Sequence, residues 1–155
     1  MKLIFICTGN TCRSPMAEAM LKKMLEEKNM KNVEVYSAGL AAQNGEKATK
    51  EAIEVMEEYG VDLNTHRAKN INNINLNEID LILCVNLQTK YIIEQLHPEI
   101  KNKVYTIEEY ADSIDDKLVQ GIPDPWGFSV DSYKKCREKI EQLLLKIINK
   151  LNMGK

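Results

Sequence analysis

After two residues the sequence continues Leu3-Ile4-Phe5-Ile6-Cys7-Thr8-Gly9-Asn10-Thr11-Cys12-Arg13-Ser14. The four apolar residues are typical of a buried strand, and Cys7 stands where that strand ends. Ser14-Pro15 is typical of a helix start, because proline is well tolerated in the first turn of a helix. A strand, a tight loop and a helix in this order begin a βαβ unit, which predicts a parallel sheet with Cys7 at the carboxyl edge of one strand.

The loop between Cys7 and Arg13 has the chemistry of an anion site. Five intervening residues allow successive N–H groups to point into one hollow, with Gly9 expected where the backbone bends. The following helix start adds positive potential, and the Arg13 guanidinium can hold two phosphate oxygens at once. A thiol facing such a hollow ionises easily, which makes Cys7 a candidate nucleophile. The alternative, that Cys7 is a small buried apolar residue, does not explain why strand, loop, arginine and helix start occur together.

The rest of the chain alternates strand and helix patterns without a linker or an internal repeat. The predicted strands are 3–7, 33–37, 81–85 and 104–107, and the predicted helices are 16–29, 46–59, 87–96 and 132–151. In the last helix, apolar residues recur every three or four positions and form one packing face. The pattern predicts a single α/β domain over residues 1–155, a three-layer sandwich with a four-stranded parallel sheet and helices on both faces.

Composition narrows the class of function. The chain has 155 residues, 44% of them hydrophobic, and a net charge of −2, so we expect one compact domain and no nucleic-acid partner. It shows no leader sequence and no apolar stretch long enough for a bilayer, which predicts a cytoplasmic protein without a membrane partner. Four cysteines without paired spacing fit a reducing compartment. The two histidines, His66 and His97, lie far apart, so no metal site is predicted.

A second motif, Pro123-Asp124-Pro125-Trp126-Gly127, lies late in the chain. Taken alone, it is typical of a turn. Together with Cys7, the five-residue spacing to Arg13 and the following Ser14, it gives a chain that resembles the low-molecular-weight protein tyrosine phosphatases over essentially its whole length. The resemblance implies the strand order 2-1-3-4 and makes Asp124 the general acid.

The resemblance also implies a mechanism. The Cys7 thiolate attacks phosphorus and Asp124 protonates the leaving group, and water then hydrolyses the phosphocysteine with Asp124 as base. Arg13 and the loop amides hold the phosphoryl oxygens throughout. No metal or other cofactor is needed, and the partners are phosphorylated proteins, on which we expect the chain to act as a monomer.

Further residues receive roles from the same resemblance. It implies that Asn10, Ser14, Ser37 and His66 form a hydrogen-bond network under the phosphate loop, and Asn10 is also suited to a left-handed backbone conformation. Some family members carry a cysteine at the position of Cys12 that forms a reversible disulfide with the nucleophile, which predicts redox sensitivity through Cys7 and Cys12. The phosphate-binding loop as a whole comprises Thr8, Gly9, Asn10, Thr11, Cys12 and Ser14.

The substrate class depends on the rim of the pocket. Tyrosine-directed members commonly carry a bulky aliphatic residue where this chain has Thr11, and the whole loop closely resembles that of bacterial protein-arginine phosphatases. A hydroxyl suits a guanidinium, whereas an aliphatic branch suits a phenyl ring. We expect Trp126 to stack on the substrate group and Leu40 to form the opposite wall. The sequence thus favours phosphoarginine, with phosphotyrosine as the alternative and a neutral Thr11 left open.

Three rival functions are weaker. An arsenate reductase would need another cysteine shortly after Cys84, but the next one is Cys136. Both of these cysteines lie in apolar surroundings that predict core positions. A phosphate-carrying subunit of a sugar uptake system would require neither Arg13 nor Asp124, and a non-catalytic phosphate-binding module would have lost the nucleophile or the acid.

Overall fold

Strand β1 (Lys2–Cys7) lies inside a four-stranded parallel sheet in the computed structural model, which describes residues 1–153. Its neighbours are β2 (Glu34–Gly39) and β3 (Leu81–Cys84), and β4 (Val104–Thr106) lies beyond β3. The order β2-β1-β3-β4 confirms the predicted order, and every pairing is parallel.

The side chains of β1 alternate between two hydrophobic clusters, as the pleat of a strand requires. Leu3 and Phe5 point into the larger cluster, and Ile4 and Ile6 point into the smaller one on the other face. All four are fully buried. This explains why the strand reads as a continuous apolar run, because both of its faces are covered.

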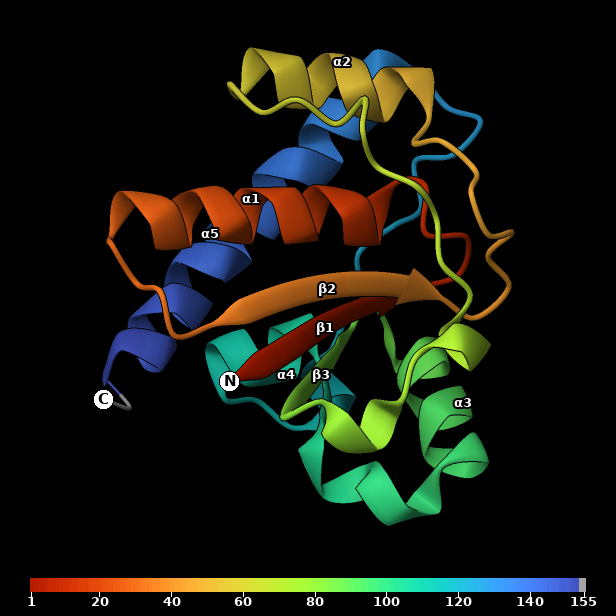
Figure 1. The fold of residues 1–155 in the computed structure, drawn as a ribbon, viewed down its shortest axis with the longest axis vertical. Coiled ribbons are helices and arrows are strands. Elements are labelled where there is room, and N and C mark those ends of the chain that lie inside the picture. Colours follow the sequence, from red (N-terminus) through yellow and green to blue (C-terminus); the bar gives the residue numbers. More distant parts are fainter. Residues whose placement is uncertain (154–155) are drawn as a thin grey trace.

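Helices cover both faces of the sheet, as predicted (Figure 1). The helices α1 (Arg13–Glu27) and α5 (Val130–Met153) pack on one face, and α2 (Lys50–Glu58) packs against α5. The other face is covered by α3 (Leu87–Leu96) and by three 3-10 helices, Ile71–Asn73, Leu76–Glu78 and Pro98–Lys103.

Two helix starts differ from the prediction by three residues or more. Helix α1 begins at Arg13, three residues early, so Arg13 and Ser14 belong to its first turn. Helix α2 begins at Lys50, four residues late, because the Thr49 hydroxyl accepts a hydrogen bond from the Ala52 amide and caps the helix there. The residues just before it run beside another segment instead, with Lys47 opposite Arg67.

The short helix α4 (Ile107–Asp112) was not predicted. Strand β4 ends at Thr106, whose hydroxyl accepts a hydrogen bond from the Glu109 amide while the Glu109 carboxylate accepts one from the Thr106 amide. This capping box turns the chain into a helix at Ile107, where the apolar run had been read as strand. Helix α4 packs against α5 on the face of the sheet that holds the larger cluster.

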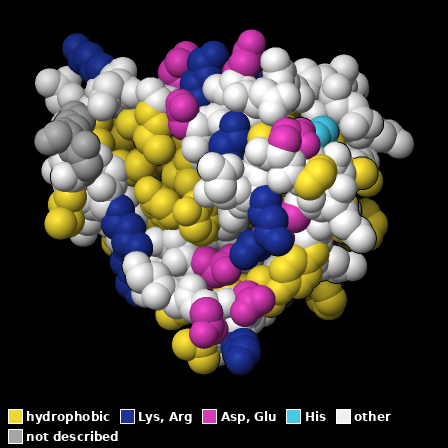
Figure 2. All heavy atoms as spheres, turned by 90° about the horizontal axis from the view of Figure 1, so that it is seen from below, with side chains coloured by type: hydrophobic (Ala, Val, Ile, Leu, Met, Phe, Trp, Pro, Cys, Tyr) yellow, Lys and Arg dark blue, Asp and Glu magenta, His cyan; other side chains and the backbone are white. Residues whose placement is uncertain are grey.

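The surface carries charges of both signs. Figure 2 shows one face of the molecule, on which Lys and Arg side chains alternate with Asp and Glu, and hydrophobic side chains reach the surface between them. Over residues 1–153, every helix is too short or too polar to cross a bilayer.

Candidate active site

The loop from Thr8 to Cys12 joins the carboxyl end of β1 to the first turn of α1. Its left-handed residue is Asn10, with φ 57°, as expected of an asparagine there. The bend therefore does not rest on Gly9, which lies outside the left-handed region. The glycine that the loop requires is Gly39, because a Cβ on it would lie 2.6 Å from the Thr8 carbonyl oxygen.

The segment after β2 holds the backbone of the loop in place. The amides of Leu40 and Ala41 donate hydrogen bonds to the carbonyl oxygens of Cys7 and Thr8, at 3.0 and 2.9 Å. These two carbonyl groups are therefore bonded to the residues that follow β2, and they point away from the loop amides that a bound anion would use.

The thiol of Cys7 lies at the base of this loop. Its Sγ is 2.8 Å from the Ser14 Oγ and accepts a hydrogen bond from the Asn10 amide at 3.2 Å. Both groups stabilise negative charge on sulfur, one through a hydroxyl and one through a backbone N–H.

The four predicted support residues form one hydrogen-bond network. The two Nδ2 hydrogens of Asn10 are donated to Ser14 Oγ at 2.8 Å and to Ser37 Oγ at 2.9 Å. The Asn10 Oδ1 accepts from the Lys69 amide at 2.9 Å, which fixes the orientation of the side-chain amide. Since Ser14 accepts from Asn10, its own hydrogen is left for Cys7.

His66 joins this network through the backbone of Asn10. Its Nε2 lies 2.8 Å from the Asn10 carbonyl oxygen, which only accepts, so Nε2 carries the proton. Burial lowers the pKa of His66, which favours the neutral ring at pH 7.

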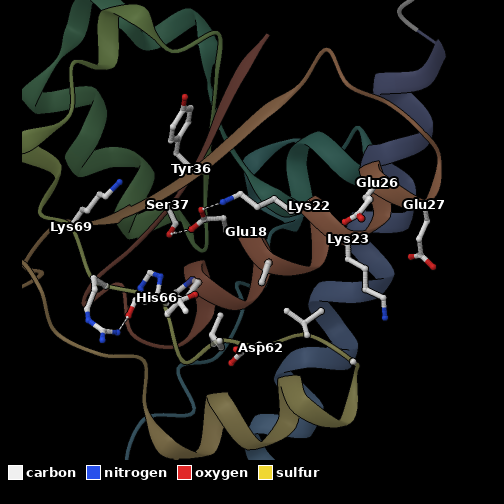
Figure 3. Close-up of a pocket in the computed structure, with 17 residues that line it drawn as sticks. Glu18, Lys22, Lys23, Glu26, Glu27, Tyr36, Ser37, Asp62, His66 and Lys69 are labelled. Atoms are coloured by element: carbon white, nitrogen blue, oxygen red, sulfur yellow. Dashed lines mark hydrogen bonds and ion pairs between the residues drawn. The ribbon is translucent and has the colours of Figure 1, made fainter.

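The network ends at Glu18, a residue that was not predicted. The Ser37 hydroxyl donates to the Glu18 carboxylate at 2.5 Å, and Lys22 pairs with the same carboxylate (Figure 3). An acidic residue in the second turn of a helix is ordinary in sequence, so nothing marked it. Glu18, Ser37 and His66 also line a hollow of about 990 Å³ between α1 and residues 60–69.

Cys7 does not face that hollow but lines a smaller pocket of about 230 Å³. Arg13 is 4% exposed there; its Nη1 donates to the Ile122 carbonyl at 2.8 Å, and its Nη2 lies 3.6 Å from the Asp124 carboxylate. The structure thus brings Asp124 to the mouth of the pocket from more than a hundred residues away in sequence. The pocket is lined by Cys7, Thr8, Gly9, Thr11, Cys12, Arg13, Ala41, Glu46, Asp124 and Trp126.

One predicted wall residue lies elsewhere. Leu40 packs against the smaller hydrophobic cluster and is not part of this lining, because its amide is bonded to Cys7 and the chain turns there. Ala41 and Glu46 take its place, and neither had a signal in the sequence. Trp126 stands at the rim as expected, with a largely exposed ring.

The other cysteines have separate surroundings. Cys12 Sγ lies 3.4 Å from the Tyr133 hydroxyl and 3.7 Å from the Thr49 hydroxyl, and burial raises the pKa of Cys12. Cys84 and Cys136 are buried in the core, as predicted. Within residues 1–153, no three His, Cys, Asp or Glu side chains are grouped as a metal site requires.

Comparison with known proteins agrees with this geometry. The model of the family described as "Low molecular weight phosphotyrosine protein phosphatase" matches residues 2–155. A protein-arginine-phosphatase of Bacillus subtilis is 38% identical over 151 residues, which is 97% of either chain. A low molecular weight protein-tyrosine-phosphatase, PtpB, of Staphylococcus haemolyticus is also 38% identical, over 95% of this chain and 97% of its own.

A solved structure shows the same fold. The YwlE arginine phosphatase of Geobacillus stearothermophilus superposes with a TM-score of 0.88 at 33% identity, covering 99% of this chain and 94% of that one.

Proposed function

Because the chain belongs to the low molecular weight phosphotyrosine protein phosphatases, we propose that it removes phosphate from phosphoarginine in proteins through a phosphocysteine intermediate. It is a low molecular weight protein phosphatase; the substrate and the roles of its residues are the proposal. Relatives named as arginine and as tyrosine phosphatases share the same 38% identity with it. The observation that carries the choice between them is therefore local: Thr11 lies in the wall of the pocket.

In the first step, the Cys7 thiolate forms a bond to phosphorus while the bond to the leaving nitrogen or oxygen breaks. The proton that the leaving atom needs comes from the Asp124 carboxylic acid, which is 50% exposed and stands at the mouth of the pocket. Arg13 and the loop amides neutralise the three equatorial oxygens, whose charge persists throughout the transfer.

In the second step, Asp124 takes a proton from water, water oxygen bonds to phosphorus, and the bond from phosphorus to Cys7 breaks. The sulfur leaves as a thiolate, for which Ser14 Oγ at 2.8 Å and the Asn10 amide at 3.2 Å are placed as donors. The network through Ser37 and His66 holds Asn10 in its left-handed conformation for this purpose.

The pocket chemistry favours a guanidinium leaving group. Among the residues that the structure describes, the Thr11 hydroxyl has only a long contact to Cys12 Sγ, 3.8 Å, so it is available to a polar substrate group or to water. Asp124 can pair with the guanidinium, and the ring of Trp126 can stack on it. The exposed Trp126 would also accept a phenyl ring, which keeps phosphotyrosine as the second candidate.

The partners are phosphorylated proteins, and Cys7, Arg13 and Asp124 all come from one chain, so a monomer suffices. All four cysteines, each within the described residues, are unpaired. A working thiolate beside other free thiols suits a reducing compartment, so the site of action is the cytoplasm.

The test is a comparison of substrates with two variants at Thr11. We expect the unmutated enzyme to release phosphate faster from a phosphoarginine protein than from a phosphotyrosine peptide at matched concentration. Thr11→Ile should lower kcat/KM for phosphoarginine by about 10- to 100-fold, the effect of losing a hydrogen bond to a charged group. Thr11→Ser keeps the hydroxyl and should keep the preference.

A preference for phosphotyrosine in all three proteins would make Thr11 incidental and the enzyme a tyrosine phosphatase. If none of them released phosphate from either substrate, the assignment as a phosphatase of this mechanism would fail.

A further inference from the structure

The backbone that leads to Asp124 is anchored over three consecutive residues. Hydrogen bonds are made by the backbone amides of Gln120, Gly121 and Ile122 and by the carbonyl groups of Gly121 and Ile122. The Ile122 amide donates to the Val85 carbonyl at 3.1 Å, and Ile122 itself is buried in the core.

Two of these anchors come from one carboxylate on the unpredicted helix α4. Glu108 is 7% exposed; its Oε2 accepts from the Gln120 amide at 3.1 Å and its Oε1 from the Gly121 amide at 2.6 Å. Gly121 has φ 85°, a left-handed conformation that favours glycine. Bonds from two backbone amides to a buried carboxylate are of the strong, charge-assisted kind.

Lys139 on α5 completes the anchor. Its Nζ donates to the Gly121 carbonyl at 2.7 Å and lies 4.0 Å from Glu108 Oε1, so the buried negative charge has a positive neighbour. Both oxygens of the Glu108 carboxylate thus have hydrogen-bond partners, and the two helices α4 and α5 both bond Gly121.

Asp124 has weaker supports of its own. It is half-exposed, its Oδ1 accepts from the Trp126 amide at 3.1 Å, and its Oδ2 lies 3.6 Å from Arg13. The only residue between Ile122 and Asp124 is Pro123, whose ring fixes its own φ and restricts the residue before it. A displacement of the anchored segment is therefore passed on to Asp124 instead of being absorbed between them.

We propose that Glu108 is a positioning residue, which holds Gln120 and Gly121 so that Asp124 reaches the leaving group. The inference rests on the proposed function, in which Asp124 is the general acid. It assigns to α4 a part in the reaction, although Glu108 neither lines the pocket nor touches the nucleophile.

The variant Glu108→Gln tests this with little change in shape. A glutamine can accept only one of the two amide hydrogen bonds, because its NH2 group faces the other N–H. The readout is kcat/KM for aryl phosphates whose phenols differ in pKa. A working general acid makes the rate nearly independent of the leaving group, so we expect a nearly flat series for the unmutated enzyme.

For Glu108→Gln we expect a loss that grows as the leaving group becomes more basic, reaching about tenfold or more for unsubstituted phenyl phosphate, since general acids contribute 10²–10⁴-fold in all. Competitive inhibition by inorganic phosphate and alkylation of Cys7 by iodoacetate should stay unchanged, because the phosphate loop is untouched.

Glu109→Gln is the matched control. It alters the neighbouring carboxylate of α4, which pairs with Lys90 and caps the helix but does not contact residues 120–121. We expect it to lower stability while leaving the series flat. In the double variant Glu108→Gln with Asp124→Asn, the loss should equal that of Asp124→Asn alone, because Glu108 acts through Asp124.

A flat series for Glu108→Gln, or additive losses in the double variant, would overturn the inference. If Glu108→Gln does not fold, Lys139→Met removes the bond to the Gly121 carbonyl and leaves Glu108 in place; it must then give the same growing loss. If the unmutated enzyme releases phosphate neither from an aryl phosphate nor from phosphoarginine, the proposed function fails instead, so the two failures are distinguishable.

Discussion

At the scale of single residues, Cys12 and Cys7 share a loop but have different partners. Cys7 is hydrogen-bonded within the loop, whereas Cys12 contacts Tyr133 and Thr49 outside it. Since burial raises the pKa of Cys12, it stays a thiol at neutral pH. A thiol in this position can still condense with an oxidised neighbour.

We therefore expect peroxide to inactivate the enzyme reversibly. Peroxide oxidises Cys7 to a sulfenic acid, the Cys12 thiol attacks that sulfur with loss of water, and dithiothreitol reduces the resulting disulfide. Activity should return on reduction in the unmutated enzyme and much less in Cys12→Ser, whose Cys7 goes on to irreversible acids. Cys84→Ala removes a thiol on the opposite face of the sheet and should recover normally. Equal recovery in Cys12→Ser and the unmutated enzyme would contradict the disulfide.

Some residues of the site can be predicted from sequence patterns and others cannot. Cys7, Arg13 and Asp124 stand in motifs whose spacing has a chemical meaning, and the structure gathers them around one pocket. Glu18 and Gly39 had no such mark, because an acidic residue in a helix and a glycine at the end of a strand are ordinary. Their importance comes from contacts with residues distant in sequence, Ser37 and the Thr8 carbonyl.

At the scale of elements, the same distinction holds. Strand β1 and helix α3 follow from their own residues, an apolar run and a capped amphipathic segment, and were predicted with little error. Helix α4 has six residues, too few for a helical period to show, and it begins inside an apolar run continuous with β4. Only the capping box of Thr106 and Glu109 indicates it, and that pattern becomes decisive once β4 ends in the sheet.

The packing of α5 gives a test at this scale. Leu144 is 0% exposed within the larger cluster, and its neighbour Leu145 is 50% exposed. Leu144→Ala should lower the free energy of unfolding by about 2–5 kcal/mol, the cost of a cavity in a packed core. Leu145→Ala should change it by less than about 0.5 kcal/mol. Urea unfolding of both variants measures the difference, and equal costs would show that α5 does not pack as described.

At the scale of the whole molecule, the pocket is built from a segment near the start of the chain and a segment late in the chain. Cys7 and Arg13 belong to the first strand and the first helix, while Asp124 lies in the segment that leads into the last helix. Arg13 spans the two parts, because its guanidinium is bonded to the Ile122 carbonyl and lies beside Asp124. An anion in the pocket therefore binds only the folded chain.

This predicts that inorganic phosphate stabilises the protein as a whole. At a concentration one hundred times its Kd, a ligand of the folded state adds about 2.7 kcal/mol, or a rise in Tm of about 5–10 °C for a chain of this size. Cys7→Ser should lose all turnover and keep the rise, because the loop amides and Arg13 remain. Arg13→Ala should lose most of the rise, since its guanidinium supplies the buried positive charge of the pocket. Thermal unfolding in phosphate and in sodium chloride of matched ionic strength separates phosphate binding from charge screening. An equal rise in Tm in both salts would mean that the loop holds no phosphate. Retained turnover in Cys7→Ser would exclude the phosphocysteine intermediate.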